Sequence, residues 1–183
     1  RGENGKNENN EKSSTSFINQ SKTIDSSLVT TAKSDNRWNN QTYNANYKWD
    51  IDTTGQSLAI DMDFAHFYYR NPNEQSGIYQ NGQGQTMNHG VDVRTLQGNT
   101  INIYTAKADY TLPINKKINF ESGVKVSFVN TDSKIDMKGT ITQYDHFKYE
   151  EDIQAAYING NIQLGKTTIQ AGLRAENTHS KGI

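Results

Sequence analysis

The feature that most constrains the fold is a strict alternation of apolar and polar residues near the C-terminal end of the chain. Between Thr167 and Thr178 every second residue is apolar, namely Ile169, Ala171, Leu173 and Ala175. A period of two places the two sets on opposite faces of an extended strand. Gly165 and Lys166 come just before it and have the character of a two-residue turn between antiparallel strands. The sequence therefore predicts a β-hairpin with one apolar and one polar face.

The same alternation recurs along the chain in the order strand, short turn, strand, long polar segment. Clear strands are predicted over 43–51, 58–68, 103–112 and 118–128, and one through Ile153, Ala155 and Tyr157 leads into the hairpin. Two weaker strands are predicted between residues 13 and 33. We therefore expect an all-β fold in which about eight antiparallel strands form a meander that is part of a β-barrel or is curled into one.

Three polar stretches separate or precede these strands. Residues 70–99 and 131–148 are dominated by small and polar residues, and we expect them to be long, mobile loops at one end of the sheet. Residues 1–12 are of low complexity and are expected to be disordered. The whole of 1–183 is interpreted as a single β-barrel segment.

Loop length and aromatic spacing both favour a membrane barrel. Outer-membrane barrels have short turns at one end, long loops at the other, and two aromatic girdles around an apolar band about 25 Å tall. Tyr43 and Trp49 are six residues apart on one face, as are Tyr104 and Tyr110. Six residues of strand span about 20 Å. The two aromatic positions of each strand are thus spaced for such a pair of girdles.

Composition excludes several classes of protein. Leu, Ile, Val and Phe number 34 of 183 residues, which is typical of disordered chains. Disordered chains usually also carry a large net charge, whereas the 19 basic and 20 acidic residues here nearly cancel, so the charge does not support disorder. A sheet with one polar face would be equally poor in aliphatic residues. The near-neutral charge argues against a nucleic-acid partner, and the absence of cysteine excludes disulfides and thiol chemistry.

The sequence contains no pattern typical of a catalytic or metal site. Asp61 and Asp63 share one strand face, but His66 has the opposite phase and points away from both. The other histidines have no ligand-like spacing. No nucleophile has a histidine and an acid in sequence reach. We therefore expect no enzyme activity, no metal and no cofactor.

The polar faces of the predicted strands carry charged residues of both signs, which are the candidates for a lumen wall. They are Asp61, Asp63, Lys107, Asp109, Glu121, Lys125, Arg174 and Glu176. In one interpretation they meet a plug or a solute. In the other they form cross-strand charge pairs on a solvated face, each contributing roughly 0.2–1 kcal/mol. Residue by residue the second interpretation is favoured.

Three segments resemble a known family. Residues 170–178 (QAGLRAENT), 49–58 (WDIDTTGQSL) and 103–110 (IYTAKADY) resemble strands of TonB-dependent outer-membrane receptors of the Bacteroidetes type, and the resemblance spans about 38–178. It implies an envelope transporter of the bacterial outer membrane with a 22-stranded barrel and an internal plug. Such a transporter imports a large nutrient, such as a siderophore or glycan, using energy from TonB. This chain would be a part of that barrel, with the parent barrel, the plug and the TonB system as partners.

The alternative interpretation is a soluble β-barrel or sheet that binds a small ligand inside. It uses the same alternation in the reverse sense, with the apolar face inward. Periodicity alone does not separate the two, whereas loop lengths, aromatic spacing and the resemblance favour the membrane barrel.

A membrane would cover the apolar face with lipid. The residues expected to face lipid are Tyr47, Trp49, Ile60, Phe64, Tyr110, Val124 and Phe128. In water an exposed apolar patch of that size drives association, and a partial barrel leaves two unpaired edge strands. For the isolated chain we therefore expect a homo-oligomer, formed by stacking of apolar faces, rather than a curled monomer. Its interface would hold Trp49, Phe64, Tyr110, Val126 and Phe128, with Asp61, Lys125 and Arg174 toward solvent.

Overall fold

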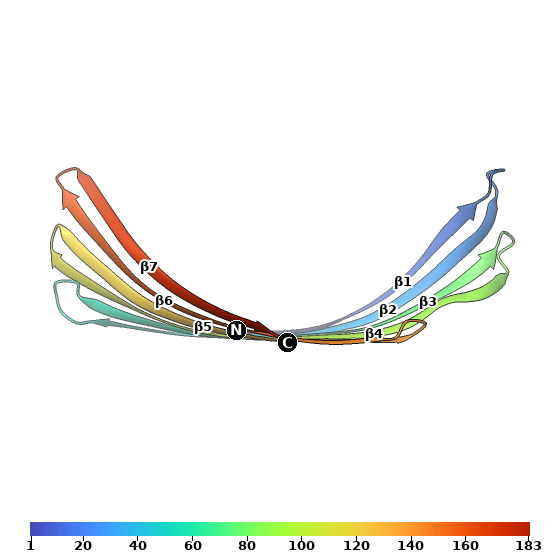
Figure 1. The fold of residues 1–183 in the computed structure, drawn as a ribbon, viewed down its shortest axis with the longest axis horizontal. Coiled ribbons are helices and arrows are strands. Elements are labelled where there is room, and N and C mark those ends of the chain that lie inside the picture. Colours follow the sequence, from blue (N-terminus) through green and yellow to red (C-terminus); the bar gives the residue numbers. More distant parts are fainter.

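The protein is a single antiparallel sheet of seven strands that are paired in chain order (Figure 1). The computed structural model describes the backbone of residues 1–183 and the side chains of all of them except Asn88 and His89. The strands are β1 (Gly2–Ile18), β2 (Ile24–Asp50), β3 (Ser57–Asn81), β4 (Thr86–Asn115), β5 (Ile118–Gly139), β6 (Gln143–Leu164) and β7 (Thr167–Gly182). The predicted all-β meander is confirmed.

The meander has seven strands, close to the expected eight, because two predicted strands are one. The weak strand after the first turn and the clear strand over 43–51 both belong to β2, which is 27 residues long. The polar residues between them, such as Asn39 and Asn40, keep the extended backbone and stay paired with β1 and β3. Alternation of apolar residues is lost there, but the hydrogen-bonded ladder continues.

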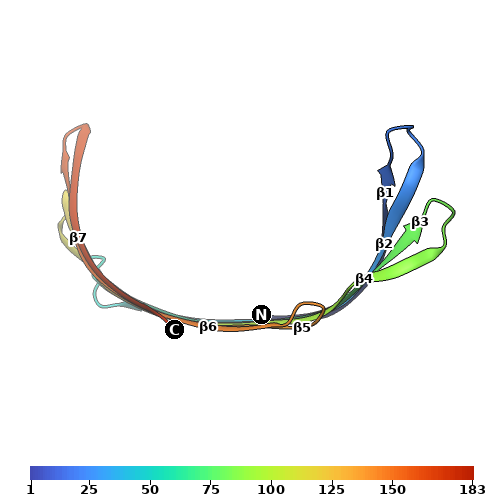
Figure 2. The ribbon, with the colours of Figure 1, turned by 45° about the vertical axis from the view of Figure 1, so that its right-hand side comes forward.

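The sheet is bent into an open trough whose edges are β1 and β7 (Figures 1 and 2). The short turns after β2, β4 and β6 lie at one end, and the turns after β1, β3 and β5 lie at the other. The segregation of turns by end therefore follows the prediction. Neither edge strand pairs with the other, so the sheet does not close into a barrel.

The expected long loops and the expected disordered N-terminus are wrong. Residues 70–99 and 131–148 are mostly strand, interrupted only by the turns at 82–85 and 140–142, and residues 2–12 belong to β1. The turn at 82–85 is tight: Asn81 Oδ1 accepts the backbone N–H groups of Gln83 at 3.0 Å and Gln85 at 2.9 Å. Gly84 has φ +79°, which favours glycine. These segments extend the hairpins well past the apolar part of the sheet.

The predicted short turns are present, and side chains close two of them. Asp52 Oδ1 accepts the backbone N–H groups of Thr54 at 2.9 Å and Gln56 at 3.1 Å. The Thr54 hydroxyl also donates to Asp52, and this lowers the pKa of the carboxyl. Asn115 closes the turn after β4 in the same way. Such local hydrogen bonds satisfy turn donors that the ladder leaves free.

Register brings the apolar residues of neighbouring strands together on one face. Tyr43, Phe64, Tyr104 and Phe128 lie directly opposite one another in a single cross-strand row. The ring centroids of Tyr43 and Phe64 are 6.1 Å apart, and those of Phe64 and Tyr104 are 4.9 Å apart. We call these four residues the aromatic row. The next row toward the long hairpins is Gln41, His66, Asn102 and Asn130, so the apolar band ends at the aromatic row.

The border of the apolar band drifts along the sheet. On β5 the last apolar residue of this face is Phe128, but on β6 and β7 it is Ala156 and Ala175, two rows nearer the short turns. Two rows are about 13 Å along a strand, and the five steps from β2 to β7 cover about 24 Å. For this border to lie at one depth in a membrane, the strands must be tilted by about 30° from the membrane normal, which is near the tilt of membrane barrels.

The polar face is the more enclosed face of the sheet. Three side chains are buried among the described residues, Val93, Ser127 and Ala155, at 9%, 8% and 7% exposure, and all three lie on it. On the apolar face Leu173 is 78% exposed. Side chains converge on the concave side of a curved sheet, so the sheet curls toward its polar face. We call this face the inner wall and the apolar face the outer wall.

The side-chain direction in β6 differs from the simplest sequence interpretation. Ile153, Ala155 and Tyr157 pair with Ser127, Lys125 and Gly123 and thus lie on the inner wall. The apolar outer residues of β6 are instead Ala156, Ile158 and Ile162, opposite the apolar set of β7. The hairpin register, with Leu164 paired to Thr167, fixes this assignment.

Candidate functional site

All eight predicted charged residues lie on the inner wall between the short turns and the aromatic row. Cross-strand pairing places Asp61 opposite Lys107, and Lys107 opposite Lys125. The remaining residues lie within two rows of Lys107 on this face, namely Asp63, Asp109, Glu121, Arg174 and Glu176. The register therefore brings the charged candidates of four strands together on one surface.

The centre of this surface is a cluster of three side chains around a glycine. Lys107 forms an ion pair with Asp109 on the same strand, and the Tyr157 hydroxyl donates to Asp109 Oδ1 from β6. Gly123 on β5 lies between Asp109 and Tyr157, and a Cβ there would collide with both side chains. Because Gly123 has no side chain, the Tyr157 ring can cross β5 and reach Asp109 on β4. Sequence reasoning missed this role of Gly123, which only the cross-strand register reveals.

The other charged residues make pairs along or between strands. Arg174 Nη2 donates to Glu176 Oε2 at 2.6 Å, and Asn44 Nδ2 donates to Asp63 Oδ1 at 2.5 Å. Glu121 Oε1 accepts from Asn119 Nδ2 at 3.4 Å. Pairs this exposed stabilise a fold by about 1 kcal/mol or less. Their mixed signs make the wall polar without giving it a dominant charge.

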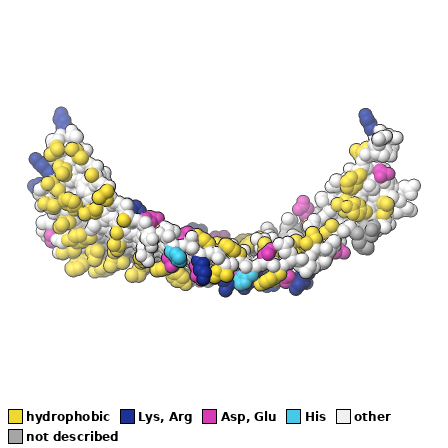
Figure 3. Space-filling view, in the orientation of Figure 1, with side chains coloured by type: hydrophobic (Ala, Val, Ile, Leu, Met, Phe, Trp, Pro, Cys, Tyr) yellow, Lys and Arg dark blue, Asp and Glu magenta, His cyan; other side chains and the backbone are white. Residues whose placement is uncertain are grey.

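The outer wall below the aromatic row exposes large apolar side chains in a continuous band. Tyr47 is 61% exposed, Val124 55% and Trp49 52%. Figure 3 shows hydrophobic side chains covering the arm of the trough that carries the short turns. A soluble monomer does not normally expose so wide an apolar surface. The band therefore needs an apolar environment.

A comparison with protein families matches residues 49–183 to the outer membrane protein beta-barrel family. The chain belongs to this family. A comparison with curated proteins gives no match. Membership implies the bacterial outer membrane. Barrels of that membrane turn an apolar band toward lipid and line the lumen with the opposite face, so we expect the outer wall to face lipid along the band and the inner wall to face the lumen.

Among the described residues, no group of three or more histidine, cysteine or acidic side chains is placed to hold a metal ion. No helix in the described part of the chain is long and apolar enough to cross a membrane. Whether the chain has catalytic activity stays a prediction from the sequence.

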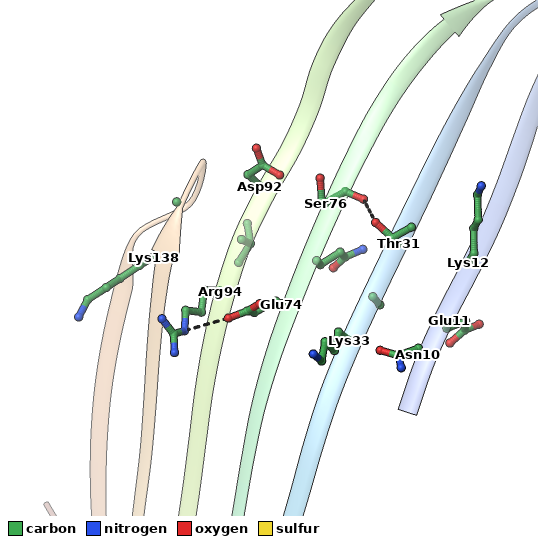
Figure 4. Close-up of a pocket in the computed structure, with 14 residues that line it drawn as sticks. Asn10, Glu11, Lys12, Thr31, Lys33, Glu74, Ser76, Asp92, Arg94 and Lys138 are labelled. Atoms are coloured by element: carbon green, nitrogen blue, oxygen red, sulfur yellow. Dashed lines mark hydrogen bonds and ion pairs between the residues drawn. The ribbon is translucent and has the colours of Figure 1, made fainter. Parts of the chain in front are cut away.

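Beyond the aromatic row, the outer wall becomes charged. Arg37 Nη2 donates to Asp35 Oδ2 at 2.7 Å, and this hydrogen bond holds the pKa of that carboxyl below its ordinary value. Further along, Arg94 Nε lies 3.5 Å from Glu74 Oε1, with Lys33 and Lys138 on the flanking strands (Figure 4). A surface with this density of exposed charge belongs in water. We expect the change from aromatic to charged side chains to mark the edge of the membrane on this face.

The inner wall changes character at the same level, and sequence reasoning missed this part entirely. Here Trp38, Phe67 and Tyr69 point inward from β2 and β3, together with Ile101 on β4. All four residues lie outside the segment 70–99 that was expected to be a loop, but their cross-strand neighbours on this face include amides such as Asn40 and Asn99. Because both faces of these strands are largely polar, a pattern of alternating apolar and polar residues does not reveal them.

Proposed function

We propose that this chain is part of the barrel of a TonB-dependent transporter, which imports a large nutrient and catalyses no reaction. The observation that supports it most is the tilted apolar band of the outer wall, bordered by the aromatic row and backed by a charged inner wall. Family membership and the resemblance of 170–178 to receptor strands support the same conclusion. The long hairpins beyond the band would form the external mouth.

The partners follow from surfaces that the sheet leaves open. The edges of β1 and β7 would pair with further strands of the parent barrel, because unpaired ladder groups are not tolerated in lipid. The plug would contact the charged inner wall around Lys107, Asp109 and Tyr157, and TonB would act through the plug. A soluble barrel with a small ligand inside needs its apolar face enclosed, whereas the enclosed face within the band is polar.

The isolated chain presents a different problem. In water both the apolar band and the two edges would be exposed. We propose that separate copies associate through Trp49, Phe64, Tyr110, Val126 and Phe128. Light scattering should then report an oligomer at micromolar concentration, and a monomer would contradict stacking.

Membrane placement is tested with two adjacent residues of β5. Val124 lies on the outer wall and Lys125 on the inner wall. In the full-length protein in vesicles, a bimane fluorophore on Val124→Cys should be quenched by brominated lipid, and one on Lys125→Cys should not. This chain has no cysteine of its own to interfere. Equal quenching at both positions would contradict the barrel.

The transport role is tested separately. The full-length protein should bind the purified C-terminal domain of TonB in a pull-down, and uptake of its nutrient should stop in cells without TonB. A protein that passes the lipid test but does not bind TonB would be a membrane barrel of another kind.

A further inference from the structure

Among the residues whose side chains the structure describes, the inner wall beyond the aromatic row carries no charged side chain over β2 to β5. Its successive rows, taken across these four strands, are Thr42, Ala65, Ile103, Val129; Asn40, Phe67, Ile101, Thr131; Trp38, Tyr69, Asn99, Ser133; and Ser34, Asn73, Thr95, Met137. Asn71 and Gln97 pair in the row between the last two. We call this surface the neutral window. On the outer wall at the same height charges are frequent, so the neutrality is specific to the inner wall.

A shallow hollow lies in the middle of the neutral window. Its volume is about 340 Å³, which is at the small end of ligand sites. Two rows of inward side chains form its sides, and Tyr68 lines it between them. The residues that line it from these two rows are Trp38, Asn40, Phe67, Tyr69, Asn99 and Ile101.

The aromatic rings of the hollow are held in fixed positions. The Trp38 ring lies across Gly5 of β1, where a Cβ would come within 2.8 Å of Trp38 Cη2 and closer still to two other ring atoms. The indole therefore lies against the sheet, with its other face toward the lumen. The Tyr69 hydroxyl donates to Asn36 Oδ1 at 3.1 Å, which fixes the second ring. Tyr69 remains 37% exposed and can contact a ligand.

Two amide oxygens of the neutral window lack a hydrogen-bond donor. Asn71 Oδ1 and Asn99 Oδ1 are buried and have no partner among the described residues. Buried acceptors are paired in nearly all folded proteins. Both side chains lie on the inner wall, Asn99 in the Tyr69 row and Asn71 in the next row toward the hairpin tips. Asn99 lines the hollow, and a rotation of its amide would turn this oxygen toward a donor on a bound ligand.

These observations define the chemistry of the ligand. Flat rings with an open face accept an apolar surface, amides both donate and accept, and the lack of charge gives no advantage to an ion. Lipid is excluded because the window lies beyond the aromatic row. A sugar chain has apolar ring faces and hydroxyl donors around every ring, and it carries no charge when neutral. We propose that the neutral window binds a neutral oligosaccharide.

This assignment rests on the proposed function, because the wall must face a lumen that a solute can enter. It adds the class of the nutrient and the place where the nutrient is held at the mouth. The charged cluster around Lys107 lies deeper on the same wall and is left to the plug.

The test is isothermal titration of the full-length protein in detergent with maltohexaose, cellohexaose, laminarihexaose and mannohexaose, and with an oligogalacturonate as the charged comparison. At least one neutral hexasaccharide should bind, and the oligogalacturonate should bind more weakly. Trp38→Ala and Tyr69→Ala should each weaken binding by about tenfold or more, as loss of a stacking platform does. Thr100→Ala is the control, because Thr100 lies between Asn99 and Ile101 on β4 but on the outer wall, and it should change affinity less than about twofold.

Failure to bind any of the four sugars, or an equal loss in Thr100→Ala, would overturn the oligosaccharide assignment. Neither result would affect lipid quenching at Val124 or binding to TonB, so the proposed function would stand. A photo-crosslinker at Tyr69 in intact cells gives a second outcome. If it attaches to a segment of the same polypeptide, that segment covers the window and the sugar site is wrong.

Discussion

The two halves of each long strand reverse the roles of the two walls. On β2 below the aromatic row, Tyr47 lies on the outer wall and Lys48 on the inner wall. On the same strand beyond the row, Arg37 lies outside and Trp38 lies inside. The backbone and the pairing are continuous throughout, so the reversal is carried by the side chains alone. We interpret it as a change in the environment of the outer wall from lipid to water at one level.

The inner wall changes for a different reason. Water or another part of the protein is present in the lumen at every height, so solvation does not demand a change from charged to neutral side chains. A neutral, ring-bearing surface in contact with water has a cost, which a bound ligand or covering segment would offset. The side chains of the outer wall thus indicate where the membrane lies, and those of the inner wall indicate what is in contact with the lumen.

The difference between the two halves of the outer wall is tested most directly by adding a charge to each. Ala108→Arg places a cation in the apolar band, and we expect a loss of about 2–4 kcal/mol in the free energy of unfolding in vesicles. Thr100→Arg lies on the same strand and face, eight residues away and beyond the aromatic row, and should cost close to zero. Urea titration of the protein refolded in vesicles measures both. Equal losses would mean that the membrane edge does not lie at the aromatic row.

The next largest effect concerns the charged part of the inner wall. Gly123→Val would push aside the Tyr157 ring and break its hydrogen bond to Asp109, with an expected cost of about 1–3 kcal/mol in the free energy of unfolding. Gly98→Ala is the control, because a Cβ there meets nothing within 4 Å, and it should stay within about 0.5 kcal/mol. Unfolding curves of both variants decide the matter, and an unaffected Gly123→Val would show that the ring is free to move.

The sequence predicted one half of this molecule well and the other poorly. Apolar residues such as Ile60 and Val124 alternate with charged ones in the band, so periodicity gives strands, turns and faces correctly. Beyond the band, neighbours such as Arg37 and Trp38 or Arg70 and Asn71 differ in charge or aromatic character rather than in simple hydrophobicity. An alternation exists there, but it is between charged and neutral residues, and such a sequence resembles that of a polar loop.

The candidate site shows the same division. The charged residues of the inner wall follow from strand phase, since Lys107 and Asp109 share the parity of their strand. The partner of Asp109 was not predictable, because Tyr157 reaches it across Gly123 from two strands away. Contacts of that kind depend on register, which local sequence patterns do not contain.

A third measurement compares the mobility of the halves. We expect backbone amides in the hairpin tips at 19–23, 82–85 and 140–142 to exchange with solvent faster than those of the band, because the tips bury little. Hydrogen exchange with mass spectrometry, read on β3 and β4, resolves the two regions. Exchange as slow at the tips as at Phe64 would show that the hairpins are held rigidly.

The smallest effect expected is the pH response of the charged outer wall. Because Arg37 lowers the folded-state pKa of Asp35, this pair stabilises the folded state above the unfolded carboxyl pKa of about 3.9, and the contribution is lost as pH falls through the lower folded value. Arg37→Ala should move the Asp35 pKa up toward its ordinary value in an NMR titration. Arg70→Ala, which lies near but is not hydrogen-bonded to Asp35, should leave it unchanged.

The tilt of the strands has a consequence for how the mouth and the base of the barrel are connected. β3 is 25 residues long, which is about 80 Å of strand, and at about 30° its two ends are offset by about 40 Å around the circumference. The tip of each long hairpin therefore lies above a different part of the periplasmic rim from the short turns at the other ends of the same strands. A force applied to one sector of the rim would reach the mouth sideways, several strands around the wall. We therefore expect motions at the mouth to take the form of twisting of the barrel, in which neighbouring hairpins move one after another rather than together.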